Sequence, residues 1–97
     1  MEDAQPTANE LDLQIQKTNR ELRINIRHEG DSTSGGLFIH GFQPNSRARE
    51  QGIVRVGDEV IAIDNLSVRN KDLAAIAKIL RKHRGDVIKI RVRRMVD

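Results

Sequence analysis

The stretch from Gly35 to Asp64, GGLFIHGFQPNSRAREQGIVRVGDEVIAID, decides the fold of this 97-residue chain. Leu37 and Ile39 are apolar residues two positions apart, which is the spacing of a strand that buries one face. A break at Gly57-Asp58 precedes a continuous apolar run over residues 60–63. The stretch therefore predicts one strand, an interruption and a second, more deeply buried strand.

The interruption contains a short helix. Pro44 and the polar residues after it break the first strand, and Ser46 can cap a helix because its hydroxyl accepts from a first-turn amide. Gly52 is the residue type that ends helices most readily. We expect a helix over residues 46–51.

Alternating apolar and polar residues predict further strands on both sides of this stretch. Between the second and third strands, residues 28–36 are rich in glycine, serine and acidic residues, which is typical of a hairpin loop. The predicted strands cover residues 11–16, 22–27, 37–42, 59–64 and 87–92, with a short extended piece at 67–68.

The period changes to that of a helix over residues 70–83. Apolar residues there fall at i, i+3, i+4 and i+7 and form one stripe. The stripe consists of Leu73, Ile76, Ala77 and Leu80. Asn70 is the expected N-cap, and Gly85 is expected to stop the helix.

The predicted elements form a single domain with the order β-β-β-α-β-α-β. The small, polar residues 1–9 have nothing to bury and are expected to be a disordered lead-in. The domain is expected to cover residues 10–94, followed by a tail at 95–97. No apolar run approaches the roughly 20 residues of a membrane span, and the N-terminus lacks a signal peptide's basic and apolar regions, so a soluble, non-secreted chain is expected.

Composition excludes several classes of function. The absence of cysteine rules out a disulfide framework, a zinc knuckle and a thiol nucleophile. Phe38 and Phe42 are the only aromatic residues, so stacking platforms for nucleic acid are nearly absent and no nucleic-acid partner is expected. The net charge of +3 is uneven, because residues 69–97 carry 10 basic and 3 acidic side chains, whereas residues 1–68 carry 7 and 11.

The histidines do not indicate catalysis. His28, His40 and His83 are expected in a loop, a strand and a helix end. None belongs to a nucleophile motif or has the spacing of metal ligands. We therefore expect neither an enzyme nor a bound cofactor or metal.

The central stretch resembles the middle of a PDZ domain. That family has a pattern of the type Gly-Ile-Phe-Val, then Pro-Gly-Ser-Ala-Ala, then Val-Gly-Asp-Glu-Ile-Leu. The matching residues here are Gly36-Leu37-Phe38-Ile39, Pro44-Asn45-Ser46-Arg47-Ala48, Gly52, Val56-Gly57-Asp58-Glu59-Val60-Ile61 and Asp64-Asn65. The resemblance spans roughly residues 11–92 and implies an α+β fold, a partly open antiparallel β-barrel or sandwich of five to six strands capped by one short and one long helix.

The resemblance also implies a function. PDZ domains bind the C-terminal peptides of partner proteins, which add as a strand between the second strand and the long helix. Backbone amides in the loop before the second strand hold the terminal carboxylate. The family's loop signature is Gly-Leu-Gly-Phe, and the matching residues are Glu21-Leu22-Arg23-Ile24.

This carboxylate loop departs from the family pattern. Arg23 replaces a glycine, so either the amide nest is narrower or the arginine side chain adds a contact to the peptide. Glu21 places a negative charge near the incoming carboxylate. Lys17 matches a position where the family often has a basic side chain near the carboxylate, and Arg20 is a second candidate.

The long helix sets the expected specificity. The resemblance puts Leu73 at the helix position that selects the third-last ligand residue, where a histidine would bond a Ser or Thr hydroxyl. Leu73 cannot form that bond, so ligands ending hydrophobic-X-hydrophobic, called class II, are expected. A register with Lys71 or Asp72 at this position fits the helical period less well. The residues expected to bind peptide are Lys17, Glu21, Leu22, Arg23, Ile24, Asn25, Ile26, Leu73, Ala77 and Leu80.

Three alternatives remain open. Arg81, Lys82 and Arg84 form a basic cluster that is either a solvated face or a patch for anionic lipid. The groove could take internal segments, or the domain could dimerise through an open strand edge, although a monomer is expected. The family further implies a scaffold protein of cell polarity or cell junctions, cytoplasmic and peripheral to the plasma membrane through its partners.

Overall fold

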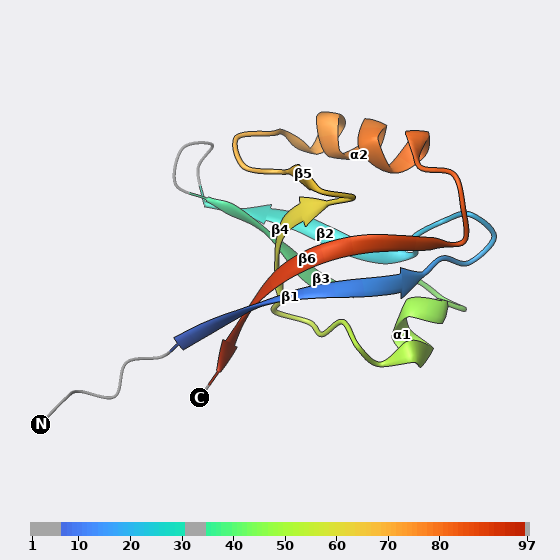
Figure 1. Ribbon diagram of the computed structural model, residues 1–97, viewed down its shortest axis with the longest axis horizontal. Coiled ribbons are helices and arrows are strands. Elements are labelled where there is room, and N and C mark those ends of the chain that lie inside the picture. The colour runs from blue at the N-terminus through green and yellow to red at the C-terminus, as the bar shows by residue number, and fades with distance from the viewer. Residues whose placement is uncertain (1–6, 31–34, 97) are drawn as a thin grey trace, which may run out of the picture.

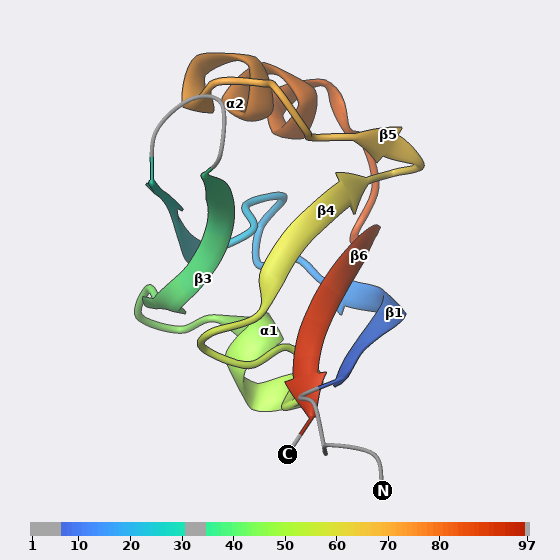
Figure 2. The same ribbon diagram turned by 90° about the vertical axis from the view of Figure 1, so that its left-hand side faces the viewer.

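The fold is an antiparallel sheet flanked by two helices, seen in a computed structural model that describes residues 7–30 and 35–96. The described elements are β1 (Thr7–Gln16), β2 (Ile24–Glu29), β3 (Gly36–Phe42), α1 (Arg47–Gln51), β4 (Glu59–Ile63), β5 (Leu66–Ser67), α2 (Leu73–Lys82) and β6 (Val87–Val96). The sheet order is β1-β6-β4-β3-β2, and β5 pairs with β4. Figures 1 and 2 show the two helices at opposite ends of the curved sheet, with α2 at the top and α1 at the bottom. The predicted fold class is confirmed.

The core is aliphatic and comes mainly from the strands. The apolar run predicted at residues 60–63 supplies three of its members, alternating positions of β1, β3 and β6 supply most of the others, and the remainder come from β2, the two helices and the loops. The largest fully buried side chains are Ile15, Ile39, Val60, Ile63, Ile88, Ile90 and Val92. The alternation read from the sequence therefore reports which face of each strand is buried.

The short helix begins and ends as predicted. The hydroxyl of Ser46 accepts a hydrogen bond from the Arg49 amide at 3.2 Å, and Gly52 closes the helix with φ of 74°. Gln51, at the end of α1, reaches the free edge of β1, where its amide accepts from Gln16 N at 3.0 Å and donates to Gln14 O at 2.8 Å. The helix thus covers two exposed backbone groups of an edge strand.

The predicted domain was too short at both ends. Thr7 pairs with Val96 and Asn9 with Arg94, so residues 7–9 and 95–96 belong to β1 and β6 rather than to a disordered lead-in and a tail. Backbone pairing accounts for this difference, because the side chains of residues 8–10 are exposed and carry no burial signal. Residues 1–6 and 97 lie outside the described residues.

Two further predictions about element boundaries were wrong. The long helix begins at Leu73 with Asp72 as its N-cap, whose carboxylate accepts from Ala75 N at 2.8 Å. Asn70 instead has φ of 62° in a turn closed by a hydrogen bond from Lys71 N to Val68 O. His28 lies in β2 and not in a loop, because β2 runs from Ile24 to Glu29 rather than over residues 22–27.

An ion pair fixes the turn before β4. The Asp58 side chain is 3% exposed and accepts hydrogen bonds from Arg94 at 2.9 and 2.7 Å and from Arg55 N at 2.9 Å. The hydrogen bonds to the Asp58 carboxylate raise the pKa of the Arg94 guanidinium. Among the described residues, no helix is both long and apolar enough to cross a membrane.

Candidate functional site

The candidate site is the open edge of β2 together with α2. β2 is the last strand in the sheet order, and β3 is its one partner among the described strands, so alternate backbone groups along β2 point away from the sheet. Its side chains alternate between the core and solvent, with Ile24 buried, Ile26 half-buried and Asn25 exposed. This edge can accept another strand.

A tight hairpin precedes β2. Thr18 and Glu21 exchange backbone hydrogen bonds of 2.7 and 2.8 Å, and the two residues between them, Asn19 and Arg20, both have positive φ. Positive φ at both central residues is typical of a two-residue hairpin turn, whose backbone twist matches the twist of the residues that it joins. The Thr18 hydroxyl also accepts from Arg47 N at 2.8 Å, which anchors the hairpin to α1.

Arg23 adopts the backbone conformation that the family's glycine allows. Its φ is 55°, in the left-handed region that costs a non-glycine residue about 1–2 kcal/mol. Its side chain donates to the Glu21 carboxylate at 3.0 and 3.2 Å and to Pro44 O at 3.1 Å, and its carbonyl accepts from Gln43 N at 3.1 Å. Hydrogen bonds to its side chain and to its backbone carbonyl therefore hold Arg23 in place.

These contacts bear on the two consequences that the sequence left open for Arg23. All three guanidinium nitrogens donate to acceptors within the domain, so the side chain is engaged before a ligand arrives. One of these contacts is an ion pair, with 3.0 Å between the Arg23 guanidinium and the Glu21 carboxylate. The loop keeps the left-handed geometry without a glycine.

The amides of Leu22 and Arg23 are the donors that a carboxylate could use. Neither donates to an acceptor within residues 7–30 and 35–96, whereas the Glu21 amide is bonded to Thr18 O. Leu22 is half-buried against the core beside them. Successive unengaged amides beside an apolar side chain are suited to a terminal carboxylate and the last side chain of a peptide.

Lys17 has partners inside the domain. Its side chain is buried, and its ammonium lies 3.1 Å from His83 Nδ1 and 3.3 Å from His83 O at the end of α2. A cation at the C-terminal end of a helix stabilises the helix dipole. A role for Lys17 beside a ligand carboxylate stays a prediction, as does that of the exposed Arg20.

The apolar stripe of α2 divides between core and surface. Ile76 is 3% exposed, Ala77 and Leu80 are half-buried, and Leu73 is 47% exposed in the first turn. An exposed leucine at the start of a helix is an apolar surface without a hydrogen-bonding group. The structure thus leaves Leu73 available at the position where the resemblance implied a selecting residue.

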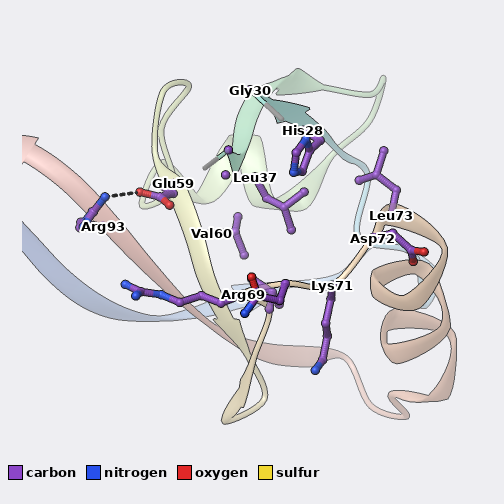
Figure 3. A pocket seen from close by; sticks show the side chains of 14 residues that line it. His28, Gly30, Leu37, Glu59, Val60, Arg69, Lys71, Asp72, Leu73 and Arg93 are labelled. Carbon is purple, nitrogen blue, oxygen red and sulfur yellow. Dashed lines mark hydrogen bonds and ion pairs between the residues drawn. The ribbon is translucent and has the colours of Figure 1, made fainter. Parts of the chain in front are cut away.

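A cleft of about 780 Å³ lies beside the start of α2 and was not foreseen from the sequence. Figure 3 shows Leu37 and Val60 lying between His28 on one side and Arg69 on the other. Its lining residues include His28, Leu37, Glu59, Val60, Val68, Arg69, Lys71, Asp72, Leu73 and Arg93. They come from β2, β3, β4, β6, the start of α2 and the segment before it, so no single sequence motif could reveal them.

The basic cluster lies at the other end of α2. Arg81, Lys82 and Arg84 are exposed, and none forms an ion pair with another described residue. No group of three or more His, Cys, Asp or Glu side chains in the described part of the chain is placed to hold a metal ion.

Comparisons with known proteins agree with this architecture. A family model described as "PDZ domain" matches residues 38–94. The chain is similar to part of human (Homo sapiens) Rap guanine nucleotide exchange factor 6, with 30% identity over 70 residues, which is 71% of this chain and 4% of that protein. It is also 30% identical over 66 residues to human E3 ubiquitin-protein ligase PDZRN3, covering 67% of this chain and 6% of that protein.

The chain thus spans only a small part of the curated relatives it matches. The crystal structure of the second PDZ domain of Dlg1 from the choanoflagellate Monosiga brevicollis has the same fold, with a TM-score of 0.73 and 22% identity, over 87% of this chain and 97% of that chain. Since the family model covers more than half of the sequence, the chain belongs to the PDZ domain family, whose members are protein-interaction modules.

Proposed function

We propose that this domain binds the C-terminal peptides of partner proteins by strand addition to β2. The observation that carries the proposal is the open edge of β2, which begins directly after the two unengaged amides of Leu22 and Arg23. The peptide lies antiparallel to β2, with its carboxylate at these amides and its last side chain against Leu22 and Ile24. The domain acts within a larger scaffold protein and meets its partners at a membrane or cell junction.

The proposed preference is for class II ligands, which end hydrophobic-X-hydrophobic. Leu73 is exposed in the first turn of α2 and offers apolar area but no hydrogen bond to a third-last Ser or Thr. Ala77 and Leu80 continue the same apolar strip along the helix. An apolar third-last side chain therefore buries apolar area against α2, which favours binding. The hydroxyl of a third-last Ser or Thr would lie there without a hydrogen-bond partner.

A library of C-terminal peptides randomised over the last residues tests this function. Enrichment of apolar residues at the last and third-last positions is expected. Leu73→His should shift the third-last choice towards Ser and Thr, whereas Leu66→His, at an exposed leucine in β5, should not. Enrichment of Ser or Thr by the unaltered domain would contradict the class II assignment.

The same peptides with a C-terminal carboxamide test recognition of the chain end. Hydrogen bonds to a charged group contribute about 1.5–3 kcal/mol each, so the carboxamide should bind at least about tenfold more weakly. Equal affinity of the acid and the amide would point to recognition of internal segments instead.

A second candidate is binding to anionic lipid through Arg81, Lys82 and Arg84. Their exposure and lack of described ion partners support it, since each nearby basic residue adds about 1 kcal/mol at an acidic membrane surface. Co-sedimentation with phosphatidylserine liposomes tests it. Retention that disappears in Arg81→Glu with Lys82→Glu, while peptide titrations stay unchanged, would support this second function, and no retention by the unaltered domain would exclude it.

A further inference from the structure

The cleft beside the start of α2 combines an apolar floor with a basic rim. Leu37, Val60 and Val68 are buried in its floor, and Arg69 and Lys71 are exposed on the segment that leads into α2. Figure 3 shows Arg69 and Lys71 along the side of the cleft opposite His28. A cleft of this kind suits an extended segment whose side chains include acidic ones.

Some of the charged side chains that line the cleft have partners within the domain and others have none among the described residues. Glu59 is paired with Arg93 at 2.8 Å, and the Asp72 carboxylate accepts from Ala75 N at 2.8 Å as the N-cap of α2. Arg69 and Lys71 form no side-chain hydrogen bond or ion pair with another described residue. Among the described residues that line the cleft, Arg69, Lys71 and Arg93 are cationic and Glu59 and Asp72 are anionic. Both anions have partners, and the two charged side chains without a described partner are the cations Arg69 and Lys71.

The cleft lies where the upstream part of a bound peptide would leave β2. A peptide antiparallel to β2 with its end at Leu22 and Arg23 runs back along the strand past Ile26 towards His28. His28 and Leu73 line the cleft from its two sides, on β2 and on α2. Paired strands have the same rise per residue, so each residue along β2 lies opposite one residue of the peptide. The peptide residues opposite His28 therefore lie about four to six residues before the last residue of the peptide.

We propose that this cleft holds acidic side chains of the bound peptide, about four to six residues before its C-terminus. The inference rests on the proposed strand addition to β2 and adds to it a second element of specificity. The apolar floor removes water from the contact, and Arg69 and Lys71 attract the carboxylates of aspartate or glutamate. The ligand class is thus a hydrophobic chain end preceded by an acidic segment.

Fluorescence-polarisation titrations with synthetic peptides test the inference. The peptides share one hydrophobic-X-hydrophobic end and carry glutamates, lysines or serines in the upstream segment, and a fourth peptide consists of the last four residues alone. The glutamate peptide should bind about five- to tenfold more tightly than the lysine peptide, and the difference should shrink at raised salt.

Charge reversal in the cleft is compared with a matched reversal elsewhere. Arg69→Glu with Lys71→Glu should abolish or invert the preference for glutamate over lysine and leave the affinity of the four-residue peptide unchanged. Arg49→Glu with Lys78→Glu makes the same change of net charge at exposed residues outside the cleft and should retain the preference. Thermal unfolding by circular dichroism establishes that both double variants are folded.

The possible failures are distinguishable. Equal affinities for the glutamate and lysine peptides, with normal binding of the four-residue peptide, would overturn the inference and leave the proposed function intact. Equal loss of the preference in both double variants would also overturn it, because the effect would then come from overall charge. Failure of every peptide to bind would overturn the proposed function, and the inference with it.

Discussion

Arg94 and Asp58 form an ion pair with two hydrogen bonds, although they lie on different elements and the Asp58 side chain is almost fully buried. The Arg94 side chain is 18% exposed and donates a third bond to Ile53 O at 2.8 Å. One guanidinium thus joins β6, the turn before β4 and the loop after α1. This explains why an aspartate follows Gly57 at the turn that the sequence marked as decisive.

Arg94→Met should destabilise the domain strongly. The substitution leaves the Asp58 carboxylate buried without its charged partner, a change that costs about 3 kcal/mol. Arg93→Met is the control, because Arg93 is 44% exposed in its pair with Glu59 and the loss should stay below about 1 kcal/mol. Urea unfolding measures both free energies, and equal losses would contradict a special role for the buried pair.

Substitution of Arg23 should separate its backbone from its side chain. Arg23→Ala removes the bonds to Glu21 and Pro44 but keeps a Cβ at φ of 55°, whereas Arg23→Gly removes both. The glycine variant should therefore be more stable than the alanine variant by about 1 kcal/mol. Urea unfolding of the two variants checks this, and an alanine variant that is as stable as the glycine variant would contradict the left-handed geometry.

Gln51→Ala should expose part of the β1 edge. The Gln51 amide holds Gln16 N and Gln14 O, and its removal returns these groups to water at a cost of about 0.5–1.5 kcal/mol. Hydrogen exchange followed by NMR should show faster exchange at the Gln16 amide, with little change at Ile15, whose register partner is Ile88 of β6. Gln43→Ala, at an exposed glutamine outside β1, is the control, and an unchanged rate at Gln16 would contradict the proposed cover.

The exposed pair of Asp12 and Arg91 should give a weak dependence of stability on pH. The hydrogen bond from Arg91 lowers the pKa of Asp12 from its ordinary value of 3.8. A carboxyl group whose pKa is lower in the folded state stabilises the fold above its unfolded pKa, and this contribution is lost as the pH falls through the folded value. The difference in unfolding free energy between the unaltered domain and Asp12→Asn should therefore be constant above about pH 5 and close below 3.8.

The control for this prediction is Asp12→Asn in a domain that already carries Arg91→Met. The hydrogen bond from Arg91 is the main cause of the lowered pKa of Asp12, so the pH dependence of the Asp12→Asn difference should largely disappear in that background. A difference for Asp12→Asn that grows as the pH falls would have the wrong sign and would contradict the pairing.

The sequence predicted which helices and strands are present better than it predicted the residues at which they begin and end. The alternation around Ile39 and Ile90 follows burial, so it reported the strands directly. Asn70 and Asp72 are both good capping residues, and only the turn that closes on the buried Val68 decides that the helix starts after Asp72. Residues 7–9 join β1 through backbone pairing, which leaves no mark on side-chain patterns.

The candidate site was foreseen only in part. The resemblance at Glu21-Leu22-Arg23-Ile24 pointed to the amides just before β2. The hydrogen bond from Arg23 to Pro44 O, however, joins residues 21 positions apart and cannot be predicted from sequence spacing. The cleft likewise depends on five elements meeting at one place. Its one local signal was the basic Arg69-Asn70-Lys71 segment, which is separated from Leu73 by Asp72.

The pairing of Thr7 with Val96 has a mechanical consequence. β1 and β6 are antiparallel neighbours, so a tension applied through the flanking chain pulls both strands away from the same end of their ladder. The rungs then break singly, starting at Thr7 and Val96, and the resistance is that of one or two hydrogen bonds at a time. A domain loaded in this way yields to small forces, while β2, where we propose that a ligand binds, lies at the opposite edge of the sheet and is not in the line of pull.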